Sequence, residues 1–157
     1  MNPFDIILIS TLFSGLVIAY KLLSRKKEKK IYRFAALLAL ATAFLITWAN
    51  LAIGVIGSED NPINLLFFLV LVVGIIGASL SHFKPKGMSN TLIAMGFVQL
   101  AIPFAALIIN KPSINTSEDL RGVVMIIIFN SVFSVLFAIS ALLFKRAALS
   151  GLKQNGK

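Results

Sequence analysis

Long apolar stretches alternate with short polar connections along the whole chain. A helix needs roughly 20 apolar residues to cross a hydrocarbon core of about 30 Å. Five stretches have about this length, and they cover residues 6–23, 34–56, 65–83, 91–109 and 122–144. The last four contain no Asp, Glu, Lys or Arg, and the first contains only Lys21, close to its end. The pattern predicts an all-α bundle of five membrane-spanning helices.

Composition supports this class. Hydrophobic residues make up 58% of the 157 residues and charged residues 13%, against roughly 45–50% and 25% in soluble domains. The mean hydropathy is +0.92. Such a chain has too little polar surface to cover itself in water. We therefore predict one membrane unit with an N-terminal anchor and basic loop (1–31), a four-helix core (32–146) and a basic tail (147–157).

Basic residues are distributed unevenly between the connections. Thirteen of the 15 Lys and Arg residues lie in the first connection (with Lys21), the third connection and the C-terminal segment, and two lie in the fourth connection. Cytoplasmic loops carry the excess of such residues, so we predict an outer N-terminus and a cytoplasmic C-terminus. The first stretch begins MNPFD and is followed by KLLSRKKEKKIYR. This order is the reverse of a signal peptide and indicates an anchor.

The net charge of +9 is concentrated between spans. Contact with anionic lipid headgroups explains such clusters more simply than nucleic-acid binding does. The side chains predicted to make this contact are Arg25, Lys26, Lys27, Lys29, Lys30 and Arg33.

The triplet Ser-Glu-Asp occurs at residues 58–60 and again at 117–119, and it holds four of the six acidic residues. Both copies precede a predicted helix on the outer side. Acids in a first turn face the positive end of the helix dipole, so we interpret both triplets as helix starts. We predict Ser117 as the cap of the last helix.

Small residues recur at four-residue spacing in three of the spans, as in Ala35–Ala39–Ala43, Gly74–Ala78 and Asn130–Ser134–Ala138. Such stripes let helix backbones approach closely in a bilayer. Packing within this chain is the favoured interpretation, and packing against a partner subunit is the alternative.

Neutral polar side chains lie within the spans. At about 1.5 Å per residue, Asn50, Gln99 and Asn130 fall in the same half of the bilayer, so they could form one cluster. One interpretation is that these amides tie helices together. The other is a site for a small neutral solute.

No ionisable residue lies deep in any span. Proton pumps, ion-coupled carriers and voltage sensors depend on such groups, which argues against those classes. The chain has no Cys and one His, His82, so we predict no enzyme, cofactor or metal centre. A weak cation site at Glu59, Asp60 and Asn64 stays open, because loop carboxylates can bind hard cations.

The first triplet belongs to a longer run, WANLAIGVIGSEDNPINLLFFLVLVVGIIGASLSHFKPKGM. This run resembles a group of small bacterial integral membrane proteins with a GxIGSEDNPxN loop, a Gly-rich helix and a basic turn ending in Gly-Met. The resemblance covers about residues 33–144. It implies a four-helix core in a bacterial cytoplasmic membrane and assigns no activity. The first span is an addition to that pattern.

These observations together predict a small non-catalytic integral membrane protein that packs with itself or with a larger membrane complex. The alternative is a passive conduit or carrier for a small neutral solute. The candidate polar or partner site consists of Asn50, Glu59, Asp60, Asn61, Asn64, Gln99 and Asn130.

Overall fold

The computed structural model describes residues 6, 10, 13–15, 17, 20, 21, 30–53, 56, 62–110 and 115–155. Within these residues the chain is helical and contains no strand, so the predicted all-α class is confirmed. The elements are α2 (Lys30–Ile53), the 3-10 turn η1 (Pro62–Leu65), α3 (Leu66–Leu80), α4 (Pro85–Asn110) and α5 (Ser117–Asn155).

Three described helices are long and apolar enough to cross a membrane, over Lys30–Asn50, Pro85–Ile109 and Ser117–Gly151. Helices of this length and composition are typical of a membrane protein. The third predicted stretch, 65–83, is an apolar helix of 15 residues preceded by the 3-10 turn. Most of the first stretch, 6–23, lies outside the described residues.

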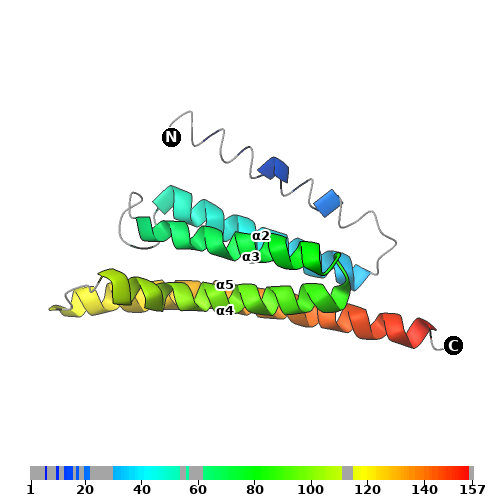
Figure 1. The fold of residues 1–157 in the computed structure, drawn as a ribbon. Coiled ribbons are helices and arrows are strands. Elements are labelled where there is room, and N and C mark those ends of the chain that lie inside the picture. The colour runs from blue at the N-terminus through cyan, green and yellow to red at the C-terminus, as the bar shows by residue number, and fades with distance from the viewer. Residues whose placement is uncertain are drawn as a thin grey trace.

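The four long helices form two layers (Figure 1). The helices α4 and α5 lie side by side and antiparallel, while α2 and α3 form the second layer. The closest contacts join α4 to α5, α2 to α5 and α3 to α4. Of the four helix pairs in contact, α2 and α3 have the smallest contact, and the site described below lies between them.

Glycines allow α3 and α4 to meet closely. A Cβ atom added to Gly77 would collide with the Thr91 side chain, and one added to Gly74 would lie 2.9 Å from Met95 Sδ. Gly74 belongs to the predicted stripe Gly74–Ala78, so its interpretation as packing within the chain is confirmed at Gly74.

Part of the other two stripes also packs inside the bundle, whereas Ala138 is exposed. Ser140 Oγ donates a hydrogen bond to the carbonyl oxygen of Ala35 at 2.7 Å, which joins α5 to α2. Ser134 Oγ donates to Gly96 O at 2.8 Å, which joins α5 to α4. Ala35 is fully buried. Small side chains thus bring the backbones within reach of short hydroxyl groups, which bind the carbonyl oxygens of neighbouring helices.

The last helix is longer than the span predicted for it. The 39 residues of α5 extend about 58 Å, roughly twice the hydrocarbon thickness. The helix runs through Lys145 and Arg146 and includes residues 147–155, which the sequence assigned to the tail. Its C-terminal part extends past the ends of the neighbouring helices (Figure 1).

The prediction of Ser117 as the cap of this helix is wrong by one residue. Thr116 Oγ1 accepts a hydrogen bond from Asp119 N at 3.2 Å, and Asp119 Oδ2 accepts one from Thr116 N at 3.0 Å. This reciprocal pair is a capping box with Asp in the place usually taken by Glu. Glu118 and Asp119 lie in the first turn, as predicted.

The close α3–α4 contact gives a stability prediction. Gly77→Ala should destabilise the protein by about 1–3 kcal/mol, because the added methyl group meets Thr91, a buried and β-branched side chain. Gly122→Ala is the matched control, since no atom lies within 4 Å of its added Cβ. Thermal unfolding in detergent measures both. Equal behaviour of the two variants would contradict the packing described.

Candidate functional site

Two buried amides join α4 to α5. Gln99 Nε2 donates a hydrogen bond to Asn130 Oδ1 at 2.7 Å, and Asn130 Nδ2 donates to Ile126 O at 2.8 Å. Both side chains have no exposed surface. Since the bond to Ile126 fixes which end of the Asn130 amide is the acceptor, the Gln99 amide is oriented as well. The predicted approach of Gln99 to Asn130 is present.

Asn50 does not share a hydrogen bond with this pair. Its Nδ2 donates to Ile46 O, one turn earlier in α2, at 2.9 Å. Counting along antiparallel α2 and α5 from the Ser140–Ala35 bond puts Asn50 roughly 7 Å beyond the level of Asn130. The predicted three-member cluster is therefore a hydrogen-bonded pair with a separate amide near it.

Two buried acceptors in this region lack partners. Among the described residues, Asn50 Oδ1 and Gln99 Oε1 are the buried side-chain atoms without a hydrogen bond. A buried amide oxygen without a donor costs about 1–3 kcal/mol. Each of these oxygens would therefore be stabilised by a donor such as a water molecule.

Asn64 ties the end of α2 to the start of α3. Its Oδ1 accepts a hydrogen bond from Ile56 N at 3.0 Å, and its Nδ2 lies 3.5 Å from Ile56 O. The side chain is buried. This pairing satisfies the backbone at Ile56, a structural use that the sequence did not show. The other loop residues of the candidate site, Glu59, Asp60 and Asn61, lie outside the described residues.

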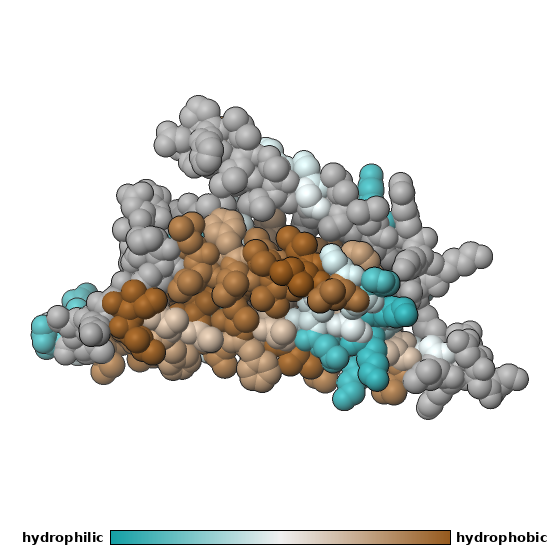
Figure 2. Space-filling model, viewed as in Figure 1, coloured by the Kyte–Doolittle hydropathy of each residue, from teal (hydrophilic) through white to brown (hydrophobic). Residues whose placement is uncertain are grey.

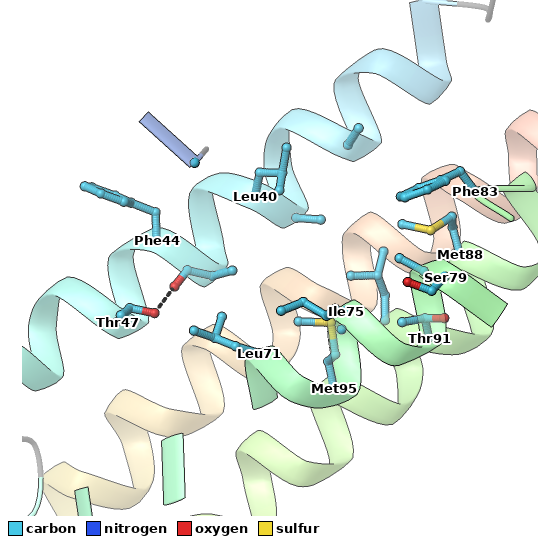
Figure 3. Close-up of a pocket in the computed structure, with 17 residues that line it drawn as sticks. Leu40, Phe44, Thr47, Leu71, Ile75, Ser79, Phe83, Met88, Thr91 and Met95 are labelled. Carbon is cyan, nitrogen blue, oxygen red and sulfur yellow. Dashed lines mark hydrogen bonds between the residues drawn. The ribbon is translucent and has the colours of Figure 1, made fainter. Parts of the chain in front are cut away.

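A groove separates α2 from α3, and we name it the α2–α3 groove (Figure 3). Its volume is about 440 Å³. The walls come from α2 and α3, side chains of α4 form the floor, and Gly15 of the first segment also lines the groove. The lining residues that matter below are Ala36, Ala39, Ala43, Thr47, Ala78, Ser79, Phe83 and Thr91.

The groove is apolar although hydroxyl groups line it. Thr47 Oγ1 donates to Ala43 O at 2.8 Å, and Thr91 Oγ1 donates to Gly87 O at 3.1 Å. Both hydroxyls are thus bonded within their own helices and present little hydrogen-bonding capacity to the groove. Sequence analysis missed this site. Its signal was the small residues Ala39, Ala43 and Ala78, which the sequence analysis assigned to close helix contacts.

A strained turn lies at one end of the groove. His82 and Phe83 both have left-handed backbone angles, with φ of 49° and 57°, which non-glycine residues rarely adopt. Phe83 O accepts a hydrogen bond from Tyr32 Oη at 2.8 Å, and Phe83 lines the groove (Figure 3). The turn therefore joins the start of α2 to the end of α3.

Basic side chains surround this end. Lys84 and Lys86 follow the turn, and Lys30 and Arg33 lie on either side of Tyr32 at the start of α2; all four are exposed. Hydrophilic side chains gather where α3 joins α4, beside a broad apolar surface (Figure 2). Lys30 and Arg33 were predicted to contact lipid headgroups, whereas Arg25, Lys26, Lys27 and Lys29 lie outside the described residues.

The only histidine contacts backbone. His82 Nδ1 lies 2.9 Å from Ser79 O, so the imidazole binds the carbonyl oxygen of Ser79 in this turn. Within the described part of the chain, no group of three or more His, Asp or Glu side chains is placed to hold a metal ion.

The Gln99–Asn130 bond gives a second prediction. Asn130→Leu should destabilise the protein by about 1–3 kcal/mol, because it breaks an interhelical bond and leaves the Gln99 amide without a partner. Ser131→Ala is the control, since Ser131 Oγ donates only to Ile127 O of its own helix. Thermal unfolding of the double variant Gln99→Leu/Asn130→Leu should show less than the summed loss. Strict additivity would refute the coupling.

Comparisons with known proteins identify no relative of this chain. No family model matches the chain, and no curated protein or solved structure matches it with significance. The resemblance of residues 33–144 to bacterial proteins with a GxIGSEDNPxN loop stays a prediction.

Proposed function

We propose that this protein is a small non-catalytic integral membrane protein that acts as an accessory or scaffold component, packed with itself or with a larger membrane complex. The observation that carries the proposal is the use of the buried polar groups. Hydrogen bonds between helices engage Gln99, Asn130, Ser134 and Ser140, and the groove is lined mostly by carbon. Such a bundle offers surfaces for packing.

The outer surface supports a packing role. Large apolar side chains are exposed along α3 and α5, including Ile75 at 68% and Leu142 at 61%. Lipid covers such side chains in a bilayer, and so does a neighbouring membrane subunit. The C-terminal part of α5, with exposed Lys145 and Arg146, extends past the bundle and offers a further contact on the side carrying the basic residues.

The proposed topology has five spans with an outer N-terminus and a cytoplasmic C-terminus, in the cytoplasmic membrane of a bacterium. The distribution of basic residues supports the orientation. In the described part, Lys30, Arg33, Lys84 and Lys86 all lie at the end of the bundle where α3 joins α4. Glu118 and Asp119 lie at the start of α5, which is the opposite end of that helix from Lys145 and Arg146.

Reporter fusions test this topology. A reporter active only in the cytoplasm should be active when fused after Lys157 and inactive when inserted at Asn115, because these positions fall on opposite sides in the proposed arrangement. An insertion between Phe83 and Lys84 should behave like the C-terminal fusion. Activity at Asn115 would overturn the orientation or the number of spans.

Isolation from native membrane in mild detergent tests the packing role. We expect other membrane proteins, or further copies of this chain, to co-purify with it. Glu59→Gln should reduce their recovery severalfold without lowering the unfolding temperature, because no basic residue of its own loop neutralises Glu59. Glu118→Gln is the matched control, since Arg121 lies one turn away on α5. Recovery of a monomer alone would contradict the proposal.

A passive route for a small neutral solute is the second candidate. The unpartnered oxygens Asn50 Oδ1 and Gln99 Oε1 favour it, because they would accept hydrogen bonds from a polar solute. Vesicles containing the protein should then swell faster in a gradient of a neutral solute such as glycerol, and Gln99→Leu should abolish the difference. Equal swelling of protein-containing and protein-free vesicles would exclude this candidate.

A further inference from the structure

We propose that the α2–α3 groove binds one acyl chain of an anionic phospholipid of the bilayer, with the lipid phosphate held at the lysines that follow the α3–α4 turn. This inference concerns a ligand of the protein and does not depend on the packing role proposed above. Four features support it: how the groove is held open, its length, the charge at its end, and its volume.

Hydrogen bonds fix α2 and α3 to each other near both ends of the groove. At one end, Tyr32 Oη donates to Phe83 O at 2.8 Å. At the other, Ile56 N donates to Asn64 Oδ1 at 3.0 Å. Between these points both walls combine small residues with larger apolar ones. The small residues are Ala36, Ala39, Ala43, Gly74 and Ala78, and the larger ones include Leu40, Phe44, Leu71 and Ile75. The small residues on both walls leave the space that forms the groove.

The groove has the length of one bilayer leaflet. Its α2 wall runs from Ala36 to Thr47, which corresponds to about 16 Å of helix. Half of a hydrocarbon core of about 30 Å is about 15 Å. An acyl chain that begins at the headgroup level beside Phe83 would thus follow the groove through its own leaflet.

The charge at the Phe83 end suits a phosphate. Lys84 and Lys86 are exposed directly after the turn, and the Tyr32–Phe83 bond brings Lys30 and Arg33 of α2 to the same end. The described carboxylates, Glu118 and Asp119, are in the first turn of α5, whereas Phe144 near its other end contacts Tyr32 with ring centroids 4.9 Å apart. Lipid headgroup phosphates at this level therefore meet the exposed cations of Lys84 and Lys86, while the two described carboxylates lie at the other end of α5.

The volume and lining of the groove suit a lipid chain. The groove has a volume of about 440 Å³ and is lined mostly by carbon, so a hydrocarbon chain of the bilayer can occupy it. The first hydrophobic segment also reaches the groove, because Gly15 is one of the lining residues and Phe13 contacts Phe44 with ring centroids 6.1 Å apart.

Native mass spectrometry of the full chain in nanodiscs tests the proposal, with equal amounts of phosphatidylglycerol and phosphatidylcholine as the probe lipids. The protein should retain one phosphatidylglycerol per chain in preference to phosphatidylcholine. Lys84→Gln/Lys86→Gln should lower this preference by about fivefold for each lysine removed. Arg121→Gln, which removes a cation from the first turns of α5, is the control and should leave the preference unchanged.

Filling the groove should remove the lipid itself. Ala43→Phe on the α2 wall and Ala78→Leu on the α3 wall should each abolish the retained lipid at an unchanged unfolding temperature. Ala138→Phe, on an exposed face of α5, should not. If neither groove variant changes retention, another part of the protein fills the groove and the proposal is wrong. If either variant instead dissociates a dimer, a second copy occupies the groove and the proposal is equally wrong.

Discussion

Hydrogen bonding without water is the constraint on which the rest of the structure depends. In a bilayer core the backbone polar groups must find their partners within the protein, and a buried polar side chain is stabilised when it does the same. Here short hydroxyl groups of one helix reach carbonyl oxygens of the next, as Ser140 does at Ala35 and Ser89 at Ala141. Such bonds require closely packed backbones, so they occur where small residues line the contact. The same requirement explains why the amides of Gln99 and Asn130 face each other in the interior.

The groove exists because small residues form close contacts between some helices and not between others. Between α3 and α4 the small residues form close helix contacts, as where Gly77 lies against Thr91. Between α2 and α3 small residues line a gap, and hydrogen bonds at Tyr32 and Asn64 join the segments near the ends of these helices. A membrane protein can keep such a gap, since lipid chains rather than water lie beside it. The strained turn at His82 and Phe83 sets the position of one end.

Periodicity and composition located much of this arrangement in advance. The apolar stretches at 34–56, 91–109 and 122–144 fall on α2, α4 and α5, and the acids of the second triplet lie in the first turn of α5, as predicted. The cap itself was assigned to Ser117, because Ser and Thr are both good caps and their order gives no preference. The structure selects Thr116, since Asp119 three residues later returns the bond.

The sequence alone determined that the chain is an all-α protein with helices suited to a bilayer, because apolar length and charge distribution are properties of the chain itself. Only the tertiary structure decided which polar residues meet. It joined Gln99 to Asn130 and left Asn50 bonded to its own helix. It also decided that some small residues bring helices together while others line a groove. Both outcomes depend on the distance between neighbouring helices and on the rotation of each helix about its axis. The pattern of apolar residues along one helix specifies neither.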